Sequence, residues 1–182
     1  MPDANRKSIY RYHYPLYLLT CGASGTYSAF HAISDGSFKI TIDDTEYSLT
    51  ALNFTGAATL AACATIIQTA LRAATGQYET VAYSTDHFVF TANLPITILS
   101  AGASGTNIAG TSYLNGLAGT LSESEYSEWM SWEEDNISVI RSPVVNDRFS
   151  RIFWTGEDGK LKTKGTFGTR DVGIAAPTQL TS

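Results

Sequence analysis

Residues 38–49 decide the fold, and they read Phe38-Lys39-Ile40-Thr41-Ile42-Asp43-Asp44-Thr45-Glu46-Tyr47-Ser48-Leu49. Apolar and polar residues alternate over 38–42 and again over 47–50, which is typical of strands that bury one face. The residues at 43–45 are polar and favour a turn. The stretch therefore predicts an antiparallel hairpin.

The hydrophobic period changes over residues 57–74. Apolar residues recur there at steps of three and four, at Leu60, Cys63, Ile67, Ala70, Leu71 and Ala74. This pattern predicts an amphipathic helix. We expect Thr55 or Thr59 to cap its first turn and Gly76 to end it in a left-handed conformation.

A second hairpin is predicted over 80–84 and 87–91, with its turn at Thr85-Asp86, and a short strand over 96–100. The order β-β-α-β-β-β indicates an α+β fold, in which one long helix covers a mostly antiparallel sheet. We expect three segments: an aromatic N-terminal arm (1–27), this module (28–118), and an acidic, tryptophan-containing linker with a β-rich assembly segment (119–182).

Aromatic residues gather in the two flanking segments. Tyrosines alternate over 10–14 and would share one side of an extended segment, which either docks on a neighbouring subunit or joins the chain's own core. The two tryptophans of the acidic stretch 119–136 are three apart and would share a face of a helix. Tyr and Trp dominate interface energetics. The predicted interface anchors are Tyr10, Tyr12, Tyr14, Trp129, Trp132 and Trp154.

The C-terminal third predicts strands with little core of their own. Strands are expected over 137–140 and 152–155, followed by a turn at 156–159 and a strand along which lysines alternate over 160–164. The stretch 173–178 has no pattern. We expect a partner to complete the sheet of this region.

Composition excludes several classes of function. Charged residues make up 16% of the chain and the net charge is −5, which argues against nucleic-acid binding, since that needs clustered Lys and Arg. No apolar run approaches the ~20 residues that span a bilayer, so we expect no membrane contact. The N-terminus lacks the layout of a signal peptide, which predicts a protein made in a cytoplasm.

No residue pattern assigns a catalytic, cofactor or metal site. His13, His31 and His87 are scattered, and His87 is expected to be a structural residue at a strand edge. Cys21 and Cys63 have no metal-ligand spacing and are expected to be inert thiols. The acidic turn at 43–46 lacks the spaced acids and the glycine of a calcium loop.

A repeated phrase, Gly-Ala-Ser-Gly-Thr, occupies 22–26 and 102–106. Neither copy has the lysine that follows the second glycine of a nucleotide-binding loop. Both are therefore interpreted as ordinary loops.

The middle region resembles a known module of bacteriophage tail proteins. The residues that carry the resemblance are Asp35-Gly36-Ser37-Phe38-Lys39-Ile40-Thr41-Ile42, Leu52-Asn53-Phe54-Thr55, the predicted helix, and Phe88-Val89-Phe90-Thr91. The module occurs in sheath-like and tail-fibre-associated phage proteins. Its usual pattern has Gly in the first hairpin turn, where this chain has Asp44.

The C-terminal part is similar to phage virion proteins at the tail tube or nozzle. The similar residues are Trp132, Val139-Ile140-Arg141-Ser142-Pro143, Asp147, Arg151, Trp154-Thr155-Gly156 and Pro177-Thr178. Neither resemblance carries a catalytic signature.

The two resemblances imply a non-enzymatic structural component of a phage virion, a tube, nozzle or adaptor protein without cofactor. It would associate with itself and with other virion proteins through β-strand and aromatic contacts, after synthesis in the bacterial cytoplasm. One alternative is a module of a tail fibre or spike that binds a host receptor or glycan. Another is a tail-associated polysaccharide hydrolase, which would need two carboxylates at a defined separation.

Overall fold

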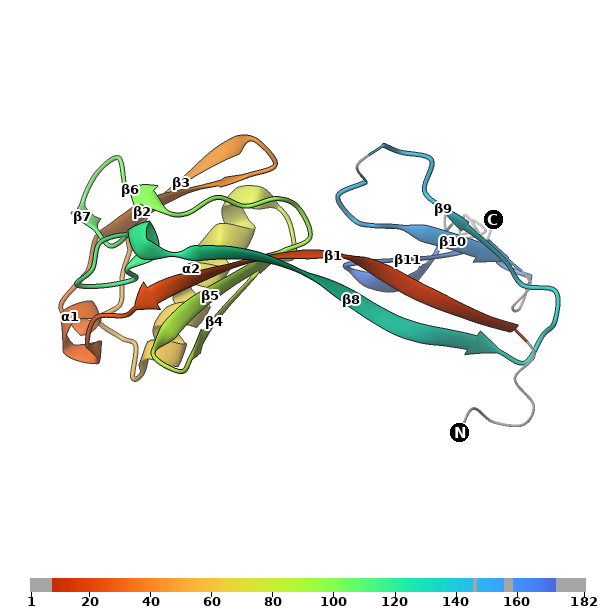
Figure 1. Cartoon of the computed structure of the whole chain (residues 1–182), viewed down its shortest axis with the longest axis horizontal. Coiled ribbons are helices and arrows are strands. Elements are labelled where there is room, and N and C mark those ends of the chain that lie inside the picture. The colour runs from red at the N-terminus through yellow and green to blue at the C-terminus, as the bar shows by residue number, and fades with distance from the viewer. Residues whose placement is uncertain (1–7, 146, 156–158, 173–182) are drawn as a thin grey trace, which may run out of the picture. The chain divides into compact units, whose positions relative to one another are not determined.

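The computed structural model describes residues 8–145, 147–155 and 159–172, and the chain forms two compact units (Figure 1). The larger unit is Pro15–Tyr126, and the smaller one combines Met1–Tyr14 with Ser127–Ser182. These bounds differ from those of the three expected segments. The reason is that two long strands, β1 (Ser8–Ala23) and β8 (Thr120–Trp132), each contribute residues to both units.

The first hairpin of the larger unit forms as predicted. Strands β2 (Gly36–Ile42) and β3 (Thr45–Leu52) pair antiparallel, with Ile42 opposite Thr45. Asp43 and Asp44 have φ angles of 50° and 59°, which makes the connection a two-residue type I′ turn. Short strands β6 (Ser100–Ala101) and β7 (Thr106–Asn107) pair with the other edge of β2.

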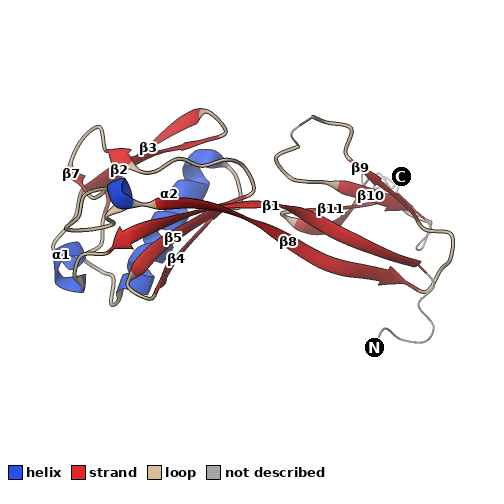
Figure 2. Cartoon of the chain, in the orientation of Figure 1, coloured by secondary structure: helices blue, strands red, loops and turns tan. Residues whose placement is uncertain are grey.

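The predicted helix is α2 (Leu60–Thr75), which lies against β3 and β4 (Figure 2). The Thr59 hydroxyl oxygen accepts a hydrogen bond from the Ala62 amide at 3.1 Å, and Gly76 is left-handed with φ 67°. Thr55 does not cap the helix; its hydroxyl donates to the Asn53 side chain at 2.8 Å. The apolar stripe of the helix is buried, as expected for an amphipathic sequence.

The second hairpin also forms as predicted, from β4 (Thr80–Ser84) and β5 (His87–Ala92), with a type I′ turn at Thr85-Asp86. β5 then pairs with β1, and Leu19 lies opposite Phe90. The resulting sheet has the order β4-β5-β1-β8. The strand expected over 96–100 is shorter: Ile96 makes a single bridge to Ile42, and β6 begins at Ser100.

Aromatic rings join the layers of the larger unit. The rings of Phe38 and Phe90, one from each sheet, meet edge to face at 5.9 Å. Phe30, from the short helix α1 (Tyr27–His31), contacts the rings of Phe54 and Phe88 at 5.4 and 5.3 Å. All five rings are fully buried, so the predicted α+β, mostly antiparallel fold is confirmed around one apolar core.

Residues 120–132 form a strand, so a helix that would place both tryptophans on one face is wrong. One 3-10 turn, Gly116–Ala118, precedes the strand. Side chains alternate across a strand, so residues three apart lie on opposite faces. Accordingly, Trp132 is 5% exposed and Trp129 is 73% exposed.

The described part of the smaller unit contains a four-stranded antiparallel sheet of its own, with the order β12-β11-β10-β9. Its strands are β9 (Ser138–Arg141), β10 (Ile152–Thr155), β11 (Lys162–Gly165) and β12 (Gly168–Asp171). Three of these were expected, and β12 was not. The expected turn at 156–159, except for Gly159, and the stretch 173–178 lie outside the described residues. None of the described helices is long and apolar enough to cross a membrane.

The choice between the two candidate caps of α2 can be tested by substitution. We expect Thr59→Ala to lower the free energy of unfolding by about 1 kcal/mol, because the Ala62 amide loses its acceptor. Thr55→Ala removes an exposed local bond instead and should cost less. Urea unfolding of both variants measures the difference, and equal losses would contradict the assignment of the cap.

Candidate assembly surfaces

The predicted aromatic anchors fall mainly in the core of the smaller unit. Tyr12, Trp132 and Trp154 are 1%, 5% and 3% exposed and pack with Ile152. Tyr10 and Tyr14 are half-buried beside them. The tyrosines do share one side of a strand, and of the two readings for this segment the structure favours a strand of the chain's own core.

Charged side chains border this aromatic cluster. Lys164 forms an ion pair with Glu128, and its ammonium lies 5.5 Å from the centre of the Tyr12 ring. Burial, together with the nearby Glu128 carboxylate, raises the pKa of Tyr14. The phenol of Tyr14 therefore stays neutral throughout the physiological range.

Trp129 is the predicted anchor that remains exposed. Three other large apolar side chains of the smaller unit are also exposed: Ile140 at 63%, Val144 at 55% and Val145 at 86%. The interface role of the six aromatic residues stays a prediction, and Trp129 is the member of the set whose surface is available to a partner.

The exposed apolar side chains occupy two different outer faces of the smaller unit. On β8, Met130 and Trp132 pack in the aromatic cluster, so Trp129 points to the opposite face of its strand. On β9, Val139 pairs with the buried Trp154, so Ile140 points away from the cluster on its own sheet. The unit thus presents apolar surface from both of its layers.

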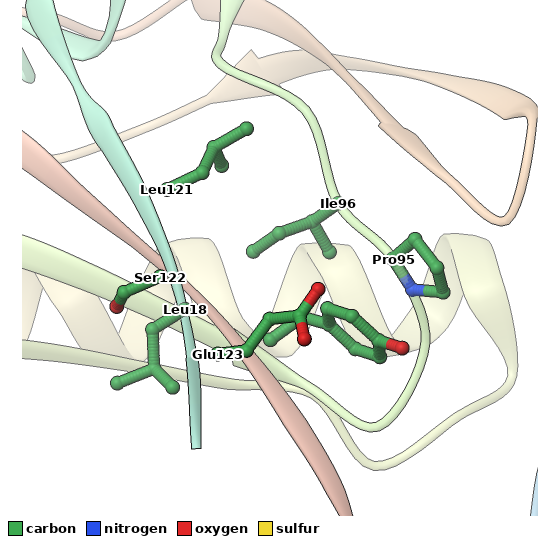
Figure 3. A pocket seen from close by; sticks show the side chains of 7 residues that line it. Leu18, Pro95, Ile96, Leu121, Ser122 and Glu123 are labelled. Atoms are coloured by element: carbon green, nitrogen blue, oxygen red, sulfur yellow. The ribbon is translucent and has the colours of Figure 1, made fainter.

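The larger unit contains a groove of about 400 Å³, which Figure 3 shows from close by. Leu121, Ser122 and Glu123 contribute from β8, Tyr17 and Leu18 from β1, and Pro95 and Ile96 from the segment after β5. Leu121 and Glu123 extend from β8 toward the segment that carries Pro95 and Ile96 (Figure 3). Most of the lining is apolar, with one carboxylate.

Beside this groove, β8 is the last strand of its sheet. Every residue from Thr120 to Ser127 is exposed. In the described part of the chain, no strand pairs with the outer edge of β8. Such an edge presents backbone donors and acceptors to other chains.

The acidic turn and His87 make contacts that support the fold. The acidic turn holds its two aspartates at the type I′ positions, and Glu46 forms an ion pair with Lys39 at 2.8 Å. The described residues hold no group of three or more His, Cys, Asp and Glu side chains arranged for a metal ion.

His87 begins β5 and donates from Nδ1 to the Cys21 carbonyl at 2.8 Å. β5 has neighbours on both sides, so His87 lies at the end of a strand but within the sheet.

Cys21 and Cys63 are buried and free. Burial raises the pKa of Cys21 to about 12 and also raises that of Cys63. The reactive thiolate is therefore scarce at neutral pH, which supports the interpretation of inert thiols.

The two Gly-Ala-Ser-Gly-Thr phrases serve as tight connections. The first runs from the end of β1 to Thr26, which caps α1, and the second joins β6 to β7. A Cβ atom at Gly25 would lie 1.7 Å from the Ser112 carbonyl oxygen. The second copy is mainly a loop, as interpreted, whereas Gly22 and Ala23 of the first copy belong to β1 and only its last three residues form a connection.

A loop of the smaller unit is organised by Asp147. Its carboxylate accepts hydrogen bonds from the Phe149 amide at 3.1 Å, the Arg151 amide at 3.2 Å and the Arg151 side chain at 2.8 Å. Burial acts to raise the pKa of Asp147, but the bonds from Arg151, Phe149 and Ser142 outweigh it and lower the pKa. This loop connects β9 to β10 and includes Val144 and Val145.

Residues 18–124 match the family model of the E217 tail sheath protein gp31, insert domain. The match covers more than half of the chain and lies within the larger unit, Pro15–Tyr126. It includes the hairpins, α2, and the residues that line the groove except Tyr17. None of the curated proteins compared with the chain matches it significantly.

The Asp147 loop predicts a pH dependence of stability. Because the pKa of Asp147 is lower in the folded chain than in the unfolded one, its stabilising effect is present above the unfolded pKa and is lost as pH falls through the folded pKa. We expect Asp147→Asn to cost about 1–2 kcal/mol at pH 7 and to flatten the acid branch of the stability curve. Asp171→Asn is the control, because the Asp171 side chain is 60% exposed and its ion pairs are long, at 3.7 and 3.9 Å, so they should matter little. Thermal unfolding from pH 2 to 7 tests this, and an unchanged acid branch would contradict it.

Proposed function

Since the chain belongs to the family of the E217 tail sheath protein gp31 insert domain and is a structural protein of a bacteriophage tail, we propose that it forms a ring of identical copies at the tail tube, nozzle or adaptor. In this role the chain resides in the virion, associates with itself and with other virion proteins, and carries no catalytic activity, cofactor or metal. The larger unit is the family domain, and the smaller unit provides the contacts between copies.

The observation that carries this proposal is the apolar surface on two different faces of the smaller unit. Trp129 lies on one face, and Ile140 lies on the other. A two-fold dimer uses one self-complementary patch, whereas head-to-tail association uses two unlike patches and closes into a ring when the rotation allows. Two unlike apolar faces support the second arrangement.

Trp129 is suited to be the main anchor of that contact. A tryptophan side chain buries roughly 150–250 Å² when it enters an interface. At about 25 cal/mol per Å², burial of the exposed part of Trp129 contributes about 3 kcal/mol. The buried Tyr12, Trp132 and Trp154 hold the strand that presents it, so the anchor needs little ordering on association.

The sheet edges of the smaller unit offer a second kind of contact. β9 and β12 are the end strands of their sheet, and all residues of β12 are exposed. Addition of a neighbour's strand to such an edge gives affinity through backbone hydrogen bonds. In the proposed ring, this strand contact complements the aromatic one.

Light scattering after size exclusion tests the proposal at micromolar concentration. We expect a large closed oligomer for the natural chain. Trp129→Ser should require about a hundredfold higher concentration to reach the same mass, as follows from the loss of about 3 kcal/mol. Leu117→Ser, which alters an apolar side chain of the larger unit that is 53% exposed, should leave the mass unchanged.

Three results would count against this function. A monomer at every concentration would refute self-association. An unchanged oligomer mass for Trp129→Ser would show that Trp129 is not the anchor of the contact. A trimer would favour the alternative, a receptor-binding or glycan-binding module of a fibre or spike.

A further inference from the structure

We propose that strand β12 of one copy pairs with strand β9 of the next copy, so that the sheets of their smaller units join into one antiparallel sheet. This inference deepens the proposed function, on which it rests for the association of identical copies. It identifies the two strands that meet and the register in which they pair.

The directions of the two end strands fit this contact. The sheet has the order β12-β11-β10-β9, and each pair of neighbouring strands in it is antiparallel. Because four strands alternate, the two end strands run in opposite directions. A second copy placed beside the first in the same orientation therefore sets its β9 antiparallel to β12. Repetition of this step is a head-to-tail association, which uses two unlike edges.

The backbone of β9 presents two residues at its outer edge. In an antiparallel pair, residues alternate between bonding to the neighbouring strand and directing their backbone groups to the other side. The Ser142 amide donates to the Arg151 carbonyl at 2.9 Å, and this contact continues the register between β9 and β10. Arg141 and Val139 therefore direct their N–H and C=O groups away from β10.

The backbone of β12 has the matching phase. The Val172 amide donates to the Leu161 carbonyl at 2.8 Å, which continues the register between β11 and β12. By the same alternation, Asp171 and Thr169 direct their N–H and C=O groups away from β11. Each edge thus offers two residues with the same spacing to an antiparallel neighbour.

One register joins all four of these residues. It places Asp171 opposite Val139 of the next copy and Thr169 opposite Arg141 of the next copy. Each of these two pairs exchanges two backbone hydrogen bonds. Every residue of β12 is exposed, so the described structure leaves room for the neighbouring strand.

The side chains keep their faces in this register. Within one copy, Trp154 lies opposite both Val139 and Lys162, and Lys162 lies opposite Asp171. Directly opposed residues share a face of the sheet, so Val139 and Asp171 lie on the face that carries the buried Trp154. The joined sheet therefore continues the same inner face from one copy to the next.

The charges of the two edges are complementary. Arg141 of the next copy lies diagonally across from Asp171 on the inner face, within reach of a long side chain. The Asp171 carboxylate is 60% exposed, and its contacts with Lys160 and Lys162 are longer than hydrogen bonds, at 3.9 and 3.7 Å. A two-fold contact that joined Thr169 to Asp171 of a second β12 would instead set the Arg170 side chains of both copies opposite each other, which is unfavourable.

The outer face gains an apolar contact. Ile140 is 63% exposed, and in this register it lies opposite Arg170 of the preceding copy. The guanidinium of Arg170 lies 4.7 Å from the centre of the Phe167 ring in its own copy, which leaves the stem of the side chain available to the neighbour. Arginine stems cover apolar surface in this way, so the contact removes part of Ile140 from water.

Disulfide crosslinking of the full chain tests the inference. Ile140 and Arg170 form a non-hydrogen-bonded pair in the proposed contact, where Cα atoms lie about 4.5 Å apart and suit a disulfide. Within one copy they are three strand spacings apart, about 14 Å, which is too far. We expect the Ile140→Cys/Arg170→Cys chain, after mild oxidation, to give a ladder of reducible dimers, trimers and larger species in denaturing electrophoresis.

Three controls locate the contact. The Ile140→Cys/Thr169→Cys chain places its cysteines on opposite faces and should give no ladder. The Ile140→Cys chain alone should not crosslink, because its cysteine meets no second one. The natural chain should also remain uncrosslinked, since Cys21 and Cys63 are buried. Oxidation is carried out at a concentration at which light scattering shows the reduced variant to be oligomeric, and circular dichroism verifies that each variant folds.

Several outcomes would overturn the inference. They are equal ladders from both cysteine pairs, a covalent dimer of the Ile140→Cys chain, which would join β9 to β9, or a ladder that stops at the dimer. An oligomer that gives no ladder would leave the proposed ring intact and refute this strand pair alone. A monomer at every concentration would refute the ring, and the strand pair with it.

Discussion

The pairing of β1 with β5 is the interaction on which the rest of the structure depends. It joins residues about seventy positions apart, with Leu19 opposite Phe90, and it fixes one edge of β1 so that β8 can pair with the other. Buried backbone groups must be hydrogen-bonded. Because β1 lies between β5 and β8 in the sheet, it has a neighbouring strand on each side with which its backbone groups can pair. Pro15 lacks a donor, and it precedes Tyr17, the first residue of β1 that pairs with β5.

The two units have cores of different residue composition. The larger unit buries aliphatic and phenylalanine side chains around α2, whereas the smaller one is built around tyrosine and tryptophan bordered by charges. Along β1, the buried positions change from Tyr12 to Leu19 and Cys21, so a single strand supplies residues to both cores. A change in β1 therefore affects both units.

Local patterns in the sequence predicted most of the larger unit. Both hairpins, α2 and its left-handed end follow from periods of two and 3.6 and from turn chemistry, all of which act between near neighbours. The sequence did not predict strand β8, because its glutamates have low strand propensity and its pairing with β1 is decided by tertiary contacts. The sequence singled out the aromatic residues as interface anchors, which stays a prediction, and the burial of Tyr12, Trp132 and Trp154 in the chain's own core depends on which face of each strand is covered. The groove is assembled from three segments that are distant in sequence, so no local pattern could reveal it.

The two buried cysteines have a practical consequence for physical studies of the assembled particle. Neither thiol is accessible, and that of Cys21 stays protonated up to a pH of about 12. A single cysteine introduced at an exposed position would therefore be the preferred target of a maleimide dye, without removal of the native ones. Donor and acceptor dyes placed in this way would report distances between neighbouring copies by energy transfer. Burial of the two native thiols thus allows distances between assembled copies to be measured on a chain that carries one added cysteine.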